Sequence, residues 1–426
     1  MATLREWKKA FENGQFDKKI QALYGNLSDG QRERYIDALD QFKAFYGDRD
    51  NIIIVTAPGR TEIGGNHTDH NHGKVLTGAV NLDVLAIVSA HEQPLIRIQS
   101  KGHAENRVDL GDLSIQQNEY GHSTALIRGI ASRLQSLCHN IGGFVAYTTS
   151  DVTSGSGLSS SAAFEVLVGS IFNTLYNGNA IDSKTLARTG QYAENEYFGK
   201  PCGLLDQMGS VCGGIVAIDF KDTQSPIVEQ INFDLAAANY AMCITMAGGS
   251  HAELTGHYTA IPTEMKSVAA ALGKSVLREV SPCDFYANIA AVRKQCGDRA
   301  VLRAIHFFAD NERVDGQVDA LKSGNFDKFL ALINESGYSS YMYLQNVSTY
   351  ADSADQEVAL ALALSESLLQ GRGASRVHGG GFAGTIQAFV PNDLVDSYIT
   401  GMDALLGAGS CKALAIRGVG PVVWRL

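Results

Sequence analysis

The sequence predicts a mixed fold, α/β or α+β, made of two or three domains. The chain has 426 residues, whereas a single domain typically has about 100–150. Short β-branched runs are interleaved with longer amphipathic segments, which is typical of strands alternating with helices. With 45% hydrophobic and 19% charged residues, the composition is that of a globular chain and excludes a disordered or collagen-like one.

The N-terminal segment, residues 4–46, is expected to be helical. Its apolar side chains recur at steps of three and four residues, and charged residues fill the other face. Breaks fall at Gly14 and in the turn signal at residues 26–30. We therefore expect residues 1–47 to form a helical extension packed on the body, either as a simple cap or as an oligomer contact.

The rest of the chain alternates between strand and helix patterns. Strands are expected at residues 52–55, 80–90, 94–99, 144–147, 215–220 and 241–246, and helices at 162–176 and 184–198. Long helical segments follow from Tyr258, and strands return at 385–390 and 413–417. A turn signal between Phe220 and Ala241 marks the most plausible domain boundary.

Charge and cysteine content exclude several classes of partner. A net charge of −10 argues against binding to nucleic acid or to an anionic membrane surface, because both need a basic face. The seven cysteines are widely spaced and contain no CxxC pair, which predicts reduced thiols. The sequence shows no apolar signal segment at its start and no run of 18 apolar residues. We expect a cytoplasmic protein without nucleic-acid or membrane partners.

Glycine is abundant, 44 residues against 8 prolines, and part of it lies in three polar segments. The first, residues 57–73, follows a strand and carries one arginine, two acids and three histidines. Such a dense polar set must be solvated, mutually paired or ligand-facing. His67, Asp69, His70 and His72 could ligate a transition metal, although no HExxH motif or cysteine pair accompanies them.

The second segment, residues 153–163, is rich in glycine and serine and joins a strand to a helix. Small residues there allow the backbone amides and the positive helix end to approach a phosphate. A serine that merely caps the helix is the alternative. Residues 273–275 lack the first glycine of a Walker A motif, which excludes a P-loop NTPase.

The third segment, residues 376–385, is a glycine turn before the strand at 385–390, and a hairpin or bulge would explain it equally well.

Two carboxylates lie between the second and third segments. Glu194 could belong to a solvated face or a salt bridge, and Asp206 could be a helix N-cap. Asp206 follows a glycine in an apolar stretch, so we expect it to be partly buried and to need a partner.

Taken in order, these segments resemble the galactokinase family of the GHMP kinases. The resemblance covers most of the chain from about Ile53. It rests on five motifs: Gly59-Arg60 with His67-Thr68-Asp69, Gly157-Leu158-Ser159-Ser160-Ser161-Ala162, Cys202-Gly203 with Asp206-Gln207, the His251–Tyr258 segment, and Gly379-Gly380-Gly381-Phe382.

The resemblance implies an ATP-dependent sugar-1-kinase, with galactose as the expected substrate. In proteins like this, ATP is held by the loop Gly155, Ser156, Gly157, Leu158, Ser159, Ser160 and Ser161. Mg²⁺ is held by the positions of Ser161 and Glu194, a ligand set suited to a hard cation. Asp206 matches the catalytic acid/base and Arg60 the cation beside it. The sugar pocket matches Asn66, His67, Asp69, Gly203 and Tyr258.

For architecture, the resemblance implies two mixed α/β domains of the GHMP-kinase type, with the active site in the cleft between them. The first, residues 48–230, would be ribosomal-protein-like, and the second, residues 231–426, would be ferredoxin-like. The last strand is a candidate to return to the first domain. We expect a monomer or a weak homo-oligomer.

The chain departs from the family pattern at three positions. Galactokinases usually show Asn at the position of Glu62, Glu at that of Asn66 and Tyr at that of His70. One hypothesis is that Asn66 still holds the galactose O6 while Glu62 or a neighbour compensates. The rival is a related sugar, such as galacturonate, N-acetylgalactosamine or L-arabinose. A catalytically silent sugar or nucleotide sensor and a metal hydrolase using the histidine-rich loop are the alternatives of other classes.

Overall fold

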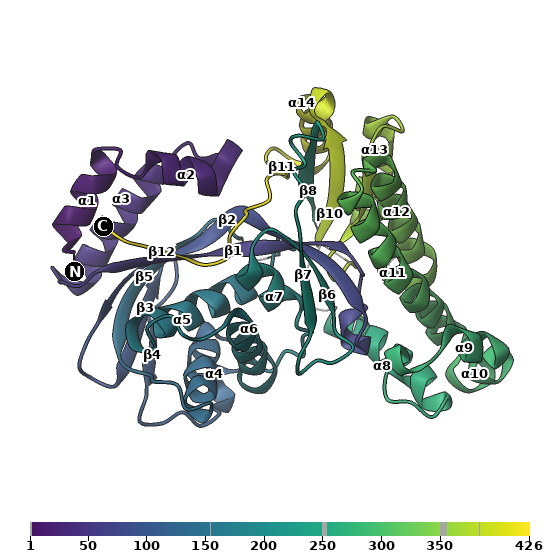
Figure 1. Cartoon of the computed structure of the whole chain (residues 1–426), viewed down its shortest axis with the longest axis horizontal. Coiled ribbons are helices and arrows are strands. Elements are labelled where there is room, and N and C mark those ends of the chain that lie inside the picture. The colour runs from purple at the N-terminus through teal and green to yellow at the C-terminus, as the bar shows by residue number, and fades with distance from the viewer. Residues whose placement is uncertain (1, 154, 249–253, 350–355, 383) are drawn as a thin grey trace.

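The computed structural model describes residues 2–153, 155–248, 254–349, 356–382 and 384–426. Within these ranges the long strands form two sheets, one of eight strands and one of four. Figure 1 shows the larger sheet with helices on both faces and the smaller sheet standing beside it, next to a group of long helices. Both sheets are mainly antiparallel, and β3 and β5 form a parallel pair.

The larger sheet has the order β12-β1-β2-β5-β3-β4, and β6 and β7 extend it from β2. Its strands are β1 (Ile53–Gly64), β2 (Lys74–Ala90), β3 (Leu95–Ser100), β4 (Asn106–Asp109), β5 (Phe144–Ser150), β6 (Ile215–Asp219), β7 (Ile227–Ile231) and β12 (Val422–Trp424). Strand β1 runs through Pro58 and Gly59, where the sequence predicted its end. A register shift between Pro58 and Arg60 accommodates the proline, which is tolerated at a bulge.

Alternating side chains of β1 serve the two faces of this sheet. Ile54 belongs to the core that faces the N-terminal helices, together with Leu85 and Tyr147. Val55 belongs to the opposite core, which the helices between β4 and β6 cover. Because successive residues of a strand point to opposite faces, one apolar run builds both cores.

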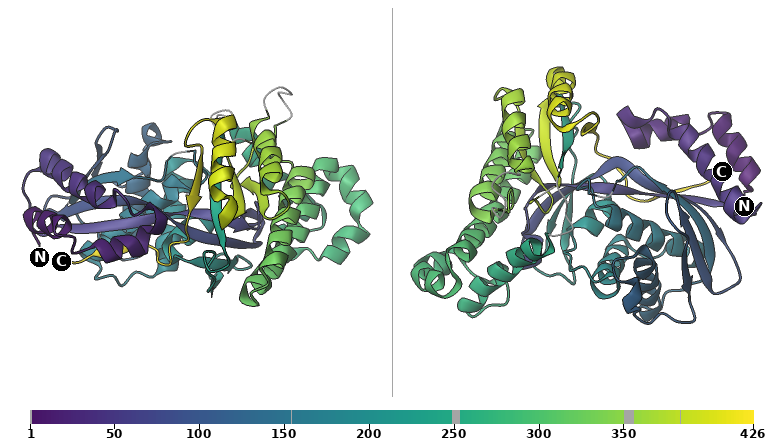
Figure 2. Two further views of the ribbon diagram at one scale, coloured as in Figure 1. Left: turned by 90° about the horizontal axis from the view of Figure 1, so that it is seen from above. Right: turned by 180° about the vertical axis from the view of Figure 1, so that it is seen from behind.

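On one face lie α1 (Leu4–Glu12), α2 (Asp17–Tyr24) and α3 (Gln31–Tyr46), with the short η1 (Gly25–Leu27) after α2. Their aromatic side chains surround the C-terminal strand, with ring centroids of Phe11 and Trp424 5.7 Å apart and those of Tyr35 and Trp424 5.0 Å apart. Figure 2 shows these helices beside β12 from above and from behind. The last strand thus joins the first sheet, and the N-terminal helices cover that junction.

The opposite face carries α4 (Ser123–Ser136), α5 (Ser160–Tyr176), α6 (Ser183–Tyr192) and α7 (Leu205–Cys212). The sequence predicted one helix over residues 184–198. The structure ends α6 at Tyr192 and continues with a wider π-type turn, η4 (Ala193–Phe198), which Gly199 closes at a φ of +81°. Such π-turns are uncommon and frequently occur at functional sites. The short η2 (Asp69–Asn71) and η3 (Gln117–Glu119) lie in loops.

The smaller sheet has the order β11-β8-β10-β9. Its strands are β8 (Tyr240–Gly248), β9 (Ala374–His378), β10 (Gly384–Pro391) and β11 (Cys411–Leu414). Helices α11 (Asp298–Lys322) and α12 (Phe326–Ser339), which the π-type turn η6 (Ser340–Leu344) extends, pack on one face. Helices α13 (Glu357–Leu369) and α14 (Val395–Leu406) pack on the other, with η7 (Asn392–Leu394) before α14.

A helical group completes this half: α8 (Thr255–Ala271), η5 (Leu277–Glu279), α9 (Pro282–Ala287) and α10 (Ile289–Cys296) pack on the first part of α11. Two expectations need correction here. The strand expected at 413–417 is Cys411–Leu414, and β9 was expected only as the start of a glycine turn. None of the described helices is both long and apolar enough to cross a membrane.

Candidate active site

Asp206, Arg60 and Ser159 come together from three separate elements. Arg60 lies on β1, Asp206 in the first turn of α7, and Ser159 directly before α5. Arg60 donates from Nε to Asp206 Oδ1 at 2.8 Å, and Nη2 lies 2.6 Å from the same oxygen. Ser159 Oγ donates to Oδ2 at 2.7 Å. Both carboxylate oxygens therefore face donors, and the side chain keeps 29% exposure for a substrate.

The surroundings hold Asp206 in its ionised form. Burial alone would raise the pKa of this carboxyl group, but the charge of Arg60 and the bonds from Ser159 and Arg60 lower it below its usual value. An ionised carboxylate with one partly open side can accept a proton from a nearby hydroxyl group. Arg60, only 8% exposed, places its positive charge at the same point.

The phosphate-type loop lies directly beside this pair. Residues 155–159 lead into the N-terminus of α5, and Arg60 Nη1 donates to the carbonyl oxygen of Gly157. A Cβ at Gly157, whose φ is +71°, would collide with Thr385 and His378 of the C-terminal half. The glycine thus lets the loop approach the second sheet closely. The first amides of α5 point out of the helix end, where the helix dipole favours an anion.

Ser161 and Glu194 also lie together. Ser161 Oγ donates to Glu194 Oε1 at 3.1 Å, and Gln207 Nε2 donates to Oε2 at 3.0 Å. Glu194 lies in the π-type turn η4 and is 1% exposed. The described residues contain no group of three or more His, Cys, Asp or Glu side chains arranged to hold a metal ion. One carboxylate and one hydroxyl group fit Mg²⁺, which keeps several waters and phosphate oxygens as ligands. This donor set does not suit a transition metal bound by protein side chains alone.

On the sugar-loop side, Asp69 and Gly203 are in direct contact. A Cβ at Gly203 would collide with Asp69 Oδ2, so only glycine lets this carboxylate approach the backbone before α7. Both residues line a cavity of about 370 Å³ that also contacts Cys202 and, from α8, Lys266. Arg60 and Asp206 lie outside the lining of this cavity. The cavity therefore does not enclose the catalytic pair.

His67 and Tyr258 are held by the third glycine segment. His67 Nε2 lies 2.9 Å from the carbonyl oxygen of Gly380, and burial lowers the pKa of this imidazole to about 3. A neutral ring must then donate from Nε2. Tyr258 donates its hydroxyl group to the carbonyl oxygen of Gly381 at 2.8 Å. The glycine turn thus presents its carbonyl groups to both side chains, and His70 stacks at 6.3 Å from His67.

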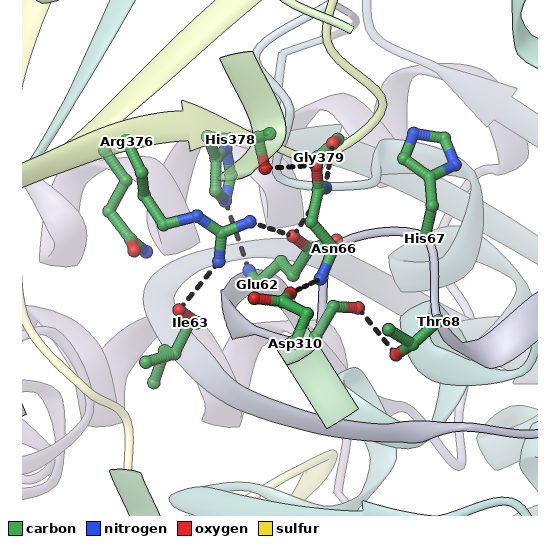
Figure 3. A network of polar contacts seen from close by, with 12 residues as sticks. Glu62, Ile63, Asn66, His67, Thr68, Asp310, Arg376, His378 and Gly379 are labelled. Atoms are coloured by element: carbon green, nitrogen blue, oxygen red, sulfur yellow. Dashed lines mark hydrogen bonds and ion pairs between the residues drawn. The ribbon is translucent and has the colours of Figure 1, made fainter. Parts of the chain in front are cut away.

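Asn66 is a buried junction between the two halves of the chain (Figure 3). Its Nδ2 donates to Glu62 Oε1 at 2.8 Å and to the carbonyl oxygen of Gly379 at 2.7 Å. Its Oδ1 accepts from Asn346 at 2.8 Å and from Ser340 at 3.2 Å. An asparagine amide has two donor hydrogens and two acceptor positions, and all four are used here. No polar atom of this side chain remains for a sugar hydroxyl group.

Glu62 and Arg376 form a buried ion pair next to this junction. Arg376 Nη2 donates to Glu62 Oε1 at 2.7 Å, and Nη1 donates to the carbonyl oxygen of Ile63 at 2.7 Å, as Figure 3 shows. The side chain of Arg376 is 0% exposed and that of Glu62 is 8% exposed. Burial nonetheless raises the pKa of Glu62, against the charges of Arg376 and Arg60. Arg376 is the main charge that opposes this effect of burial.

Several residues of this network had no role in the sequence analysis. Asp310 accepts from the backbone N–H of Asn66 at 2.8 Å, and His306 Nε2 lies 3.0 Å from the Asn66 carbonyl oxygen. His378 Nε2 lies 3.0 Å from Thr61 Oγ1. These residues are buried on α11 and β9, which the sequence does not show. The one sequence signal was the four-residue spacing of His306 and Asp310, which places both on the same face of a helix.

Comparisons with known proteins agree with this arrangement. The galactokinase galactose-binding signature matches residues 40–90, and the N-terminal domain of GHMP kinases matches residues 125–214. A galactokinase of Streptomyces coelicolor is 30% identical over 376 residues, covering 88% of this chain and 93% of that protein. A galactokinase of Glaesserella parasuis is 31% identical over 366 residues, covering 84% and 90%.

Solved structures show the same fold. Lactococcus lactis galactokinase, crystallised with galactose, superposes with a TM-score of 0.77 at 23% identity, covering 90% of this chain and 98% of that one. A mevalonate kinase superposes with a TM-score of 0.60 at 15% identity, covering 85% and 98%. The expected mixed α/β fold of the GHMP type is thereby confirmed. With relatives of about 30% identity matched over nearly their whole length, the chain belongs to the galactokinase family of the GHMP kinases.

Proposed function

We propose that this protein is an ATP-dependent sugar-1-kinase that converts D-galactose and ATP into galactose 1-phosphate and ADP. The observation that carries the proposal is the Asp206–Arg60–Ser159 group, in which a partly exposed, ionised carboxylate lies beside a phosphate-type loop. Membership of the galactokinase family, a family of kinases, supports the same conclusion.

In the proposed reaction, Asp206 accepts the proton of the anomeric hydroxyl group as its oxygen attacks the γ-phosphorus of ATP. The new O–P bond forms while the bond to the bridging oxygen breaks, and ADP leaves with that electron pair. Arg60 stabilises negative charge on the transferring oxygens and keeps Asp206 ionised. Phosphoryl transfer depends mainly on such positioning and electrostatics.

The nucleotide would lie on the backbone amides of residues 155–161 at the N-terminus of α5. Glu194 and Ser161 would hold Mg²⁺, which when bound neutralises charge on the phosphates. The sugar would contact His67, Asp69, Gly203 and Tyr258. Asp69 is suited to vicinal hydroxyl groups because a carboxylate accepts two hydrogen bonds. For Asn66 we propose a positioning role, since its own bonds are complete within the protein.

The proposed domain division and setting follow the same reasoning. We propose a helical extension at residues 1–47 and kinase domains at 48–230 and 231–426, supported by the two separate sheets. The position of β12 in the first sheet is the exception to this division. A cytoplasmic location is supported by free cysteines throughout the described residues. A monomer or weak homo-oligomer, without nucleic-acid or membrane partners, remains our prediction.

A coupled assay of ADP release tests the function directly. The purified chain is incubated with Mg²⁺, ATP and, separately, galactose, galacturonate, N-acetylgalactosamine, L-arabinose and glucose. We expect the highest kcat/KM with galactose. A site built to bond a hydroxyl group discriminates by about 10⁴-fold or more against an analogue that lacks it. A clear preference for galacturonate would overturn the galactose assignment, and absence of turnover with every sugar would favour a silent sensor.

A further inference from the structure

The π-type turn η4 places a lysine over the carboxylate of Glu194. The chain leaves η4 through Gly199, and the backbone N–H of Lys200 then donates to the carbonyl oxygen of Glu194 at 3.1 Å. The bond closes a seven-residue loop from Glu194 to Lys200, and it fixes where the lysine side chain starts. Lys200 Nζ lies 3.2 Å from Glu194 Oε1. The same oxygen accepts from Ser161 Oγ.

This ion pair differs from the other lysine pairs of the described residues. In the pairs of Lys8, Lys43, Lys74, Lys101 and Lys322, the acidic partner is 47–74% exposed. Such pairs contribute little, because water screens both charges. Glu194 is 1% exposed, whereas the side chain of Lys200 is 62% exposed. A buried carboxylate is therefore matched by a cation that can leave easily.

The buried carboxylate also has a second acidic neighbour. Gln207 Nε2 donates to Glu194 Oε2 at 3.0 Å and to Glu165 Oε2 at 2.9 Å, so one amide bridges two carboxyl groups. Glu165 is 1% exposed. Asp206 directly precedes Gln207 in α7, so three acids share this region, and Arg60 is already bonded to Asp206. Glu194 thus depends on Lys200 for its positive partner.

We propose that Lys200 is an exchangeable cation of the metal position: its ammonium group pairs with Glu194 in the nucleotide-free enzyme, and Mg²⁺ displaces it from that oxygen. This inference rests on the proposed function, because it takes Glu194 as a metal ligand. Since Lys200 is the more exposed partner, its displacement requires only a rotation of its side chain into solvent. The lysine then competes with the metal and keeps the carboxylate paired while no metal is bound.

The test measures metal binding without turnover. Mn²⁺ replaces Mg²⁺ as the probe, and electron paramagnetic resonance gives its dissociation constant for the full chain in saturating ADP. The wild type is compared with Lys200→Met, with the charge-conserving Lys200→Arg, and with Lys184→Met at an exposed position of α6. Thermal midpoints with ADP are recorded with and without Mg²⁺.

We expect Mn²⁺ to bind Lys200→Met about fivefold more tightly than the wild type, which corresponds to loss of a competing contact of ~1 kcal/mol. The variant should also melt lower than the wild type without metal and gain more from Mg²⁺. Lys200→Arg and Lys184→Met should resemble the wild type. Equal or weaker Mn²⁺ binding by Lys200→Met would overturn the inference while leaving the proposed function intact. If the wild type itself binds no Mn²⁺ with ADP, the proposed metal site fails, and this inference fails with it.

Discussion

Replacement of Arg376 by methionine tests whether the buried pair with Glu62 supports the sugar loop. Methionine preserves most of the volume of the arginine stem but removes its charge and its bonds to Glu62 and to the carbonyl oxygen of Ile63. Among the described residues, Asn66 is then the side-chain donor that Glu62 keeps. The loop that carries His67 and Asp69 begins after Gly64, close to Glu62 in the sequence.

Loss of one partner from a buried ion pair costs about 3–5 kcal/mol, because the remaining charge stays desolvated. Unfolding entropy of about 2.1 cal/mol/K per residue gives about 0.9 kcal/mol/K for this chain, so the thermal midpoint should fall by about 4 °C. Burial raises the pKa of Glu62, and loss of Arg376 must raise it further. When the pKa of a carboxyl group is higher in the native state than in the unfolded state, the protein becomes less stable as the pH rises. The loss of stability caused by Arg376→Met should therefore be larger at pH 8 than at pH 5.

The assay combines calorimetry with the KM for the sugar. We expect Arg376→Met to raise the sugar KM more than the ATP KM, because the loop carries the proposed sugar ligands. Glu62→Gln in the same chain should recover at least about 2 kcal/mol relative to the sum of the single variants. Arg372→Met, which removes an exposed pair with Asp393, is the matched control and should change stability by about 0.5 kcal/mol or less. Strictly additive single effects would refute the coupling between Glu62 and Arg376.

Three further predictions concern the catalytic group. Asp206→Asn should lower kcat by about 10²–10⁴-fold, the usual contribution of a general base, while equilibrium dialysis shows sugar and nucleotide binding nearly unchanged; near-normal turnover would contradict the mechanism. Arg60→Gln should raise the pKa of Asp206, and the acid limb of the kcat/KM profile should therefore move to higher pH than in the wild type; an unmoved limb would assign it to another group. Gly157→Ala should raise the KM for ATP by a larger factor than the KM for the sugar, because the added methyl group collides with Thr385 and His378. Equal changes in both constants would argue against a nucleotide loop.

The sequence was informative where function depends on local pattern. Glycine and serine between a strand and a helix predicted the loop before α5, and an acid after glycine predicted a partly buried Asp206. Family resemblance supplied the partners Arg60 and Glu194, and the structure brings both next to the residues expected. These local features could be predicted because only certain residues permit such turns.

The sequence was silent where a partner lies far along the chain. Asn66 and Asp310 are 244 residues apart, and Glu62 and Arg376 are 314 apart. No local periodicity reports which distant strand or helix covers a loop, so the internal bonds of Asn66 could not be predicted from the sequence. For the same reason β9 was missed: its alternating polar residues are buried against the other half and do not face water.

The pairing of β12 with β1 also sets the order in which the molecule can be completed. Arg417 donates to Thr56 across 361 residues of sequence, and Trp424 fills the centre of the aromatic group formed by the first helices. A ribosome adding about 5–20 residues per second therefore exposes β1 for tens of seconds before its last neighbour emerges. During that time the strand that carries Arg60 has an open edge, which is a site for pairing with other chains. Protection of nascent chains should therefore matter for this protein until β12 has been synthesised and has paired with β1.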